Sequence, residues 1–285
     1  MKKRILLCLM MSLLILAVLC SFAACAEPRI NEKDFIDFDY KIINDEVILT
    51  GYKGSDTVVT IPKGTTSIGD YAFYCCDQLV SIEIPKSVTS IGRSGFYACT
   101  ELTSIEIPKS VASIGDFAFQ YCDKLASITF GKNSNLTSIG RHAFSSCVNL
   151  ENIKIPSGVT ILKDATFIGC VKLASVTFDK NSKLTIIEEA AFYNCRELAS
   201  IEIPSGVTTI GDAAFGICLS LETVYYGGAN VTAWNKIAIA IPTTMMDIIP
   251  FEGALESANR YYYSTKRPTE SGKFWRYVDN LPASW

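Results

Sequence analysis

Residues 84–106 read IPKSVTSIGRSGFYACTELTSIE, and residues 107–129 read IPKSVASIGDFAFQYCDKLASIT. The pattern returns at residues 203–225 as IPSGVTTIGDAAFGICLSLETVY. Equivalent segments, spaced by 23 or 25 residues, begin at Ile61, Ile84, Ile107, Phe130, Ile155, Phe178 and Ile203. A repeat of this length predicts a solenoid, in which seven coils stack because no coil can bury its apolar face alone.

Each coil divides into short segments of different periodicity. Residues 79–84, LVSIEI, alternate apolar and polar, which predicts a strand with one buried face. Pro85 then ends the ladder because it has no backbone donor, and residues 88–91, VTSI, predict a second extended piece. Residues 118–125, AFQYCDKL, space their apolar residues by about three, which predicts one or two helical turns. We therefore expect an α/β solenoid with a parallel sheet; a parallel β-helix is the alternative, which the helical turn disfavours.

This pattern, IPxxVTSIGxxAFxxCxxLxSI, resembles the BspA-type leucine-rich repeats that also occur in treponemal surface proteins, and the resemblance covers all seven coils, residues 61–225. The flanks resemble the same bacterial group. Residues 26–60 are expected to form an N-terminal cap, a hairpin turning near Asn44-Asp45. Residues 226–285 are expected to form a C-terminal cap. Its bulk would come from Trp234, Tyr261 to Tyr263, Trp275 and Tyr277.

The first 25 residues predict an export signal, since a short basic start precedes an apolar run over residues 5–20. Residues 24–26 match ordinary cleavage between small residues. Residues 22–25 resemble a bacterial lipobox instead, which would leave Cys25 lipidated. An uncleaved anchor is a third alternative, because the run approaches the about 20 residues that span a bilayer. In each case the rest of the chain leaves the cytoplasm, and only this segment or its lipid would contact a membrane.

Eleven cysteines in an exported chain suggest a disulfide framework, but their spacing indicates another role. Seven of them stand three residues after the repeated Phe: Cys76, Cys99, Cys122, Cys147, Cys170, Cys195 and Cys218. We expect a column of buried reduced thiols, since Cys packs as a small apolar group. One Cys per coil and a lone His142 disfavour a metal site. Cys75 occupies a variable position, where an exposed free thiol and a neutral variation both remain open.

Composition and motifs disfavour two functional classes. Without the three basic residues of the export segment, 23 basic residues face 29 acidic ones, whereas nucleic-acid binding needs a basic footprint. The chain has no nucleophile-elbow, metalloprotease or phosphate-binding motif, and the repeated Ser-Ile-Gly stretches are predicted to be turns. We therefore predict no enzymatic activity, no cofactor and no metal.

The polar positions of the predicted strands form two columns on the outward, concave face of the sheet. The first runs from Ser81 to Thr223, is mostly Ser, and predicts a cross-strand hydroxyl ladder. The second is more varied, and its candidate partner-binding residues are Glu83, Glu106, Lys154, Glu202 and Tyr225. Extended concave surfaces are where solenoids commonly bind partners.

The family resemblance implies a cell-surface or secreted adhesin, with host extracellular-matrix or plasma proteins as partners. A carbohydrate-binding or structural cell-envelope module is the alternative. Glycans would then stack on the aromatic tail from Tyr261 to Trp275, although we expect those rings to be buried in the cap.

Overall fold

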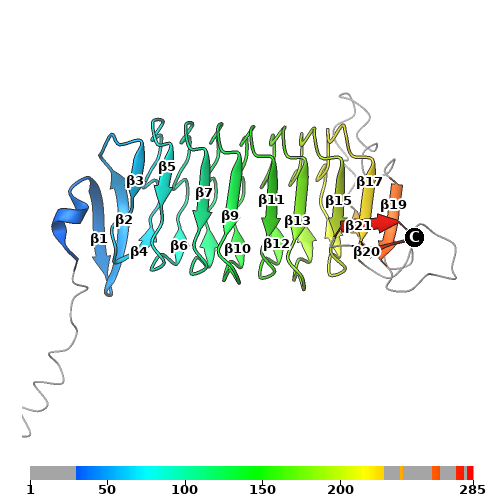
Figure 1. Ribbon diagram of the computed structural model, residues 1–285, viewed down its shortest axis with the longest axis horizontal. Helices are drawn as coiled ribbons and strands as arrows, with labels where there is room; N and C mark the ends of the chain where they lie inside the picture. The colour runs from blue at the N-terminus through cyan, green and yellow to red at the C-terminus, as the bar shows by residue number, and fades with distance from the viewer. Residues whose placement is uncertain (1–29, 228–237, 240–258, 264–273, 279–280, 285) are drawn as a thin grey trace, which may run out of the picture.

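The computed structural model describes residues 30–227 and, beyond them, the backbone of strands at residues 238–239, 259–263, 274–278 and 281–284. In this part of the chain the coils stack along one axis into a parallel β-solenoid (Figure 1). The predicted export signal with Cys25 lies outside the described residues. So do Trp234 and the side chains of the other aromatic residues assigned to the C-terminal cap.

Two ladders of parallel strands run along the stack, and each coil adds one strand to each ladder. The first ladder contains β3 (Val58–Thr60), β5 (Ser81–Glu83), β7 (Ser104–Ile107), β9 (Ser127–Phe130), β11 (Asn152–Ile155), β13 (Ser175–Phe178), β15 (Ser200–Ile203) and β17 (Thr223–Tyr226). The second contains β4 (Thr65–Ile68), β6 (Ser90–Ile91), β8 (Ser113–Ile114), β10 (Ser138–Ile139), β12 (Ile161–Leu162), β14 (Ile186–Ile187), β16 (Thr209–Ile210) and β18 (Ala238–Ile239). Equivalent repeat positions pair with one another, as Ser90 does with Ser113, so the predicted in-register stack is confirmed.

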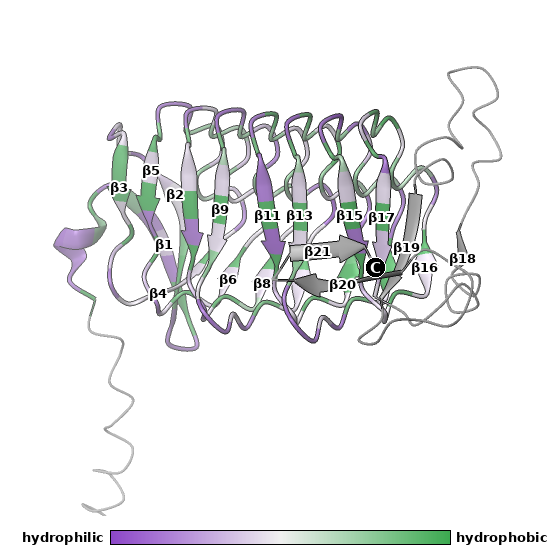
Figure 2. Cartoon of the chain, turned by 45° about the vertical axis from the view of Figure 1, so that its right-hand side comes forward, coloured by the Kyte–Doolittle hydropathy of each residue, from purple (hydrophilic) through white to green (hydrophobic). Residues whose placement is uncertain are grey.

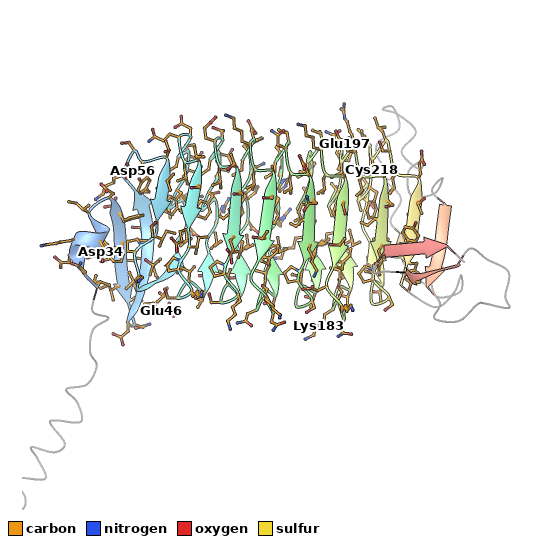
Figure 3. All side chains as sticks on the ribbon, viewed as in Figure 1. Asp34, Glu46, Asp56, Lys183, Glu197 and Cys218 are labelled. Atoms are coloured by element: carbon orange, nitrogen blue, oxygen red, sulfur yellow. The ribbon has the colours of Figure 1, made fainter. Side chains whose placement is uncertain are left out.

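The core between the ladders consists of columns that the repeat generates. Seven Phe rings stack almost parallel, with neighbouring centroids 5.0–5.4 Å apart. These rings are Phe73, Phe96, Phe119, Phe144, Phe167, Phe192 and Phe215. Along the strands, apolar and polar residues alternate, as the colour bands in Figure 2 show, and the apolar ones are buried. Charged side chains lie at both long edges of the stack, with Glu197 at one and Lys183 at the other (Figure 3).

The segment predicted to form helical turns forms a third ladder between coils instead. Alternate amides donate to the next coil, as Phe73 N does to Gly95 O at 2.8 Å, while the amides between them donate three residues back along their own segment. Two residues per coil adopt positive φ, such as Tyr71 (61°) and Cys75 (56°), which a right-handed helix does not allow. The predicted helical turn is therefore wrong for the described residues. The one helical element there is the short 3-10 helix η1 (Glu32–Phe35).

The N-terminal hairpin is present at the expected place. Strands β1 (Phe38–Ile43) and β2 (Glu46–Tyr52) pair antiparallel, and Asn44 and Asp45 turn the chain with φ of 50° and 64°. Strand β2 then pairs parallel with β4, which joins the hairpin to the second ladder. The Tyr52 ring lies 5.5 Å from Phe73 and covers the first ring of the stack.

At the other end, β19 (Asn259–Tyr263) extends the first ladder beyond β17 in parallel. Strand β20 (Phe274–Val278) follows it in the same sheet, and β21 (Leu281–Ser284) pairs antiparallel with β20. The extra residues of the two 25-residue coils lie in loops outside the ladders, where Asn133 and Asn181 adopt positive φ.

Candidate binding surfaces

The five candidate residues lie in one column of the first ladder. Glu83 lies on β5, Glu106 on β7, Lys154 on β11, Glu202 on β15 and Tyr225 on β17. Glu202 and Tyr225 are direct partners in the strand register. Glu83, Glu106 and Lys154 are exposed, whereas Glu202 and Tyr225 are half-buried. The column is thus an outward-facing row with one side chain per coil.

The charges of this column are not equally available to a partner. Lys154 Nζ lies 2.6 Å from Asp179 Oδ1 in an ion pair whose side chains are 65% and 38% exposed. Exposed pairs of this kind contribute only about 0–1 kcal/mol, so a partner could displace Asp179 at small cost. Asp179 neutralises Lys154, and the two exposed carboxylates of Glu83 and Glu106 make the first part of the column acidic.

The hydroxyl ladder predicted beside this column does not form. Among the Ser and Thr residues of 30–227, the hydroxyl groups of Ser67 and Ser90 hydrogen-bond to each other at 2.7 Å. Both lie on the second ladder, so the Ser column of the first ladder leaves its hydroxyl groups facing solvent.

A groove that the sequence interpretation missed crosses the second ladder at the first four coils. It has a volume of about 610 Å³, and Ser67, Ser90, Ser113 and Ser138 line it together with the glycines that follow them. Charged residues of both signs border it, among them Arg93 and Asp116. The repeated Ser-Ile-Gly stretches are the signal for this groove, because small side chains in register leave a hollow between larger neighbours.

Backbone packing sets the floor of the groove. A Cβ on Gly115 would lie 2.6 Å from the backbone N of Arg93 in the preceding coil, so glycine permits this close approach. Pairing in the second ladder is interrupted between β10 and β12, where Lys163 takes the glycine position. The depth of the groove therefore depends on backbone packing as well as on its serines.

Six of the seven cysteines of the column, from Cys99 to Cys218, are buried free thiols as predicted, and Cys76 at the N-terminal end of the column is half-buried. Each Sγ from Cys99 onward donates to the carbonyl of the repeated Phe in the preceding coil, at 3.1–3.3 Å. Burial raises the pKa of Cys170 and of Cys218 to about 12, which keeps both thiols neutral. Cys75 is an exposed free thiol outside this column.

The single histidine is not a simple surface residue. Its ring stacks on Phe117 at 5.1 Å between centroids, and Nδ1 is buried with no hydrogen-bond partner. Burial, reinforced by Arg141, lowers the pKa of His142. Within the described residues, no group of three or more His, Cys, Asp or Glu side chains is placed to hold a metal ion.

The parallel solenoid carries a buried Phe column and, in each coil, a buried Leu two residues before the strand of the first ladder, which is the kind of repeat expected of a leucine-rich repeat protein. Residues 52–136 and 132–240 match the model of the BspA type leucine rich repeat region, in six copies. The chain belongs to this family. The helical turn that disfavoured a parallel β-helix is absent, so it no longer separates the two folds. The family match instead favours the leucine-rich repeat.

Several solved structures are similar to the chain, and two of them are described below. A leucine-rich cell surface protein from Faecalibacterium prausnitzii is 33% identical with a TM-score of 0.60, and the match covers 67% of this chain and 53% of that protein. The leucine-rich repeat protein from T. pallidum is 28% identical with a TM-score of 0.52, and the match covers 65% of this chain and 88% of that protein. The chain thus spans about half the length of the Faecalibacterium protein. No curated protein matches the chain.

None of the helical segments in the described residues combines the length and the apolar character that crossing a bilayer requires.

Proposed function

We propose that the chain is a non-enzymatic surface protein that binds a protein partner through the column of Glu83, Glu106, Lys154, Glu202 and Tyr225. The observation that carries the proposal is the strand register, which places five variable side chains on one outward face. Neighbouring strands lie about 4.8 Å apart, so the column offers a regular row of contacts to an extended partner. Family membership and the cell-surface description of the Faecalibacterium protein support a place at the cell surface.

The partner class proposed is a matrix or other surface protein with a basic segment. Glu83 and Glu106 are exposed acids one coil apart, and Tyr225 adds an aromatic ring at the far end. Such acids steer association and select the sign of the partner more than they set its affinity. Tyr is also among the residues that most often dominate binding energy at interfaces.

The test is binding of the exported part of the chain to immobilised extracellular-matrix proteins. Alanine replaces Glu83, Glu106, Lys154, Glu202 and Tyr225 together. In the matched control, alanine replaces Glu151, Lys172, Glu197 and Glu222. This control removes as many acids and bases as the column variant does, three and one, from exposed positions outside the column. We expect the column variant to lose binding and the control to keep it. Equal binding by the wild type and the column variant would exclude this face.

A second function, glycan binding, is favoured by the groove on the second ladder. Its serine hydroxyls and charged border are polar groups suited to sugar hydroxyls, and Ser113 and Ser138 lie outside the Ser67–Ser90 hydrogen bond. On a glycan array, replacement of Ser113 and Ser138 by Val should abolish binding. Loss on Trp275→Ala, with the groove variant unaffected, would place the glycan on the aromatic tail instead.

Lipid anchoring through Cys25 is proposed from the sequence alone. Cells expressing the chain should incorporate a labelled fatty acid, and Cys25→Ser should remove the label. A label that survives this substitution would reject the anchor, and its absence from the wild type would indicate ordinary cleavage or an uncleaved signal.

A further inference from the structure

Four tyrosine side chains form a continuous row on the third ladder, across the first three coils. Tyr71 meets Tyr74 edge to face at 5.7 Å, Tyr74 stacks on Tyr97 at 4.9 Å, and Tyr97 meets Tyr121 edge to face at 5.5 Å. Tyr71, Tyr74 and Tyr121 are 49%, 48% and 43% exposed. We call these four residues the tyrosine row. Its rings hold one another in place while much of their surface stays in contact with water.

The solenoid does not require these rings. The position of Tyr71 is occupied by Ala165, Ala190 and Ala213 in the last three coils, and these residues keep the same positive φ. Coils of the same backbone form with Ala at this position, and with Ser145 or Gly216 at the position of Tyr74 and Tyr97, so the ladder forms without a ring at these positions. Large exposed rings that the fold does not use are typical of interaction surfaces.

The charges beside the row select the partner. Asp70, Asp77 and Asp123 belong to the same turns and are exposed. The basic residues of these turns are already engaged, since Lys124 Nζ lies 2.7 Å from Glu101 Oε2 and the Arg93 guanidinium lies over the Phe117 ring at 5.4 Å. An incoming cation would therefore meet acids and ring faces. The Arg93–Phe117 contact shows that this edge already holds one guanidinium over an aromatic ring.

We propose that the tyrosine row binds an arginine-bearing segment of a partner protein. A guanidinium group stacks on aromatic rings and binds a carboxylate through two parallel hydrogen bonds. It therefore matches the rings and the acids of this surface better than the ammonium group of lysine does. The inference rests on the proposed role as a surface binding protein and names a second contact area with its partner chemistry. It does not depend on the column of the first ladder.

The test uses a fluorescent nona-arginine peptide and measures its dissociation constant by anisotropy with the exported part of the chain. Each ring at an exposed site is expected to contribute about 2- to 5-fold to affinity. Tyr74→Ala with Tyr97→Ala should therefore weaken binding about 4- to 25-fold. Tyr74→Phe with Tyr97→Phe keeps both rings and should stay within about twofold. A nona-lysine peptide should bind the wild type more weakly than nona-arginine.

Tyr193→Ala is the matched control, because Tyr193 occupies the repeat position of Tyr74 and Tyr97 in the sixth coil, between Ile168 and Gly216 at the same position of its neighbours. It should leave peptide binding unchanged. The proposal is overturned if the wild type does not bind nona-arginine, if the double Ala variant binds as the wild type does, or if Tyr193→Ala weakens binding equally. Circular dichroism checks that each variant is folded.

The matrix-protein assay on the same variants separates this proposal from the proposed function. Matrix binding that survives the tyrosine substitutions, together with unchanged peptide binding, refutes the tyrosine row alone. Peptide binding that depends on Tyr74 and Tyr97 while the five-residue column variant still binds matrix proteins refutes the column alone.

Discussion

The Phe stack predicts that each ring contributes to stability through contacts with its two neighbouring rings, so the energetic coupling between coils is limited to adjacent coils. Phe119 and Phe144 are fully buried, with ring centroids 5.4 Å apart and ring planes 11° apart. Aromatic pairs in this range contribute about 0.5–1.5 kcal/mol beyond the burial of their area. Phe119→Leu removes one such contact on each side, with Phe96 and Phe144, and should lower the free energy of unfolding by about 1–3 kcal/mol.

A double-mutant cycle isolates the pairwise contribution. Leu replaces Phe119 and Phe144 singly and together, and urea unfolding followed by circular dichroism gives each free energy. We expect a coupling of about 0.5–1.5 kcal/mol for this pair. The control cycle joins Phe119 to Phe192, which is separated from it by two rings, and its coupling should stay below about 0.5 kcal/mol. Equal coupling in both cycles would refute nearest-neighbour stacking as the source of the stability.

Three further predictions concern the thiols and the close backbone packing. In a chain without the export segment, a thiol reagent at pH 8 should label Cys75 rapidly and the buried cysteines from Cys99 to Cys218 only after denaturation; rapid native labelling of Cys122 would contradict the burial. Burial raises the pKa of Cys170 and of Cys218 from the 9.0 of an ordinary Cys to about 12. Between pH 9 and pH 12 the unfolded chain therefore binds fewer protons than the folded protein. The free energy of unfolding should therefore fall above pH 9, by up to about 1.4 kcal/mol per pH unit and thiol. Cys170→Ala should reduce the difference in unfolding free energy between pH 8 and pH 10, and an unchanged difference would exclude this thiol as a contributor. Gly115→Ala forces a Cβ against the backbone of the preceding coil and should lower the free energy of unfolding by about 1–3 kcal/mol. Thermal unfolding measures this loss. An unchanged melting temperature would show that the backbone shifts to accept the Cβ.

The sequence predicts the repeat, the strands and the columns because each depends on periodicity. Leu79, Ile82 and Ile84 alternate with polar residues, and this alternation alone decides which face is buried. The cysteine column is predictable for the same reason. Each Cys stands three residues after the repeated Phe, so the cysteines occupy equivalent positions in successive coils. The hairpin turn at Asn44-Asp45 was also predictable, because these residue types tolerate positive φ.

The third ladder could not be predicted in this way. Its positive-φ positions hold Tyr71, Phe117 and Ala165, residue types that give no local signal for the left-handed region. Hydrogen bonds to the neighbouring coil hold the backbone there, so the conformation depends on contacts that a sequence window does not contain. The same limitation applies to the binding surfaces. The groove and the tyrosine row appear only when residues 23 or more apart are brought side by side.

The loops of the two 25-residue coils have a consequence for how such a gene can change. Because the extra residues leave the ladders in register, two lengths of coil coexist in one stack. Recombination between similar repeats would then add or remove whole coils. Each event would alter the length of the stack by about 4.8 Å and preserve every face, so a lineage could lengthen or shorten its binding surface without redesigning a single coil.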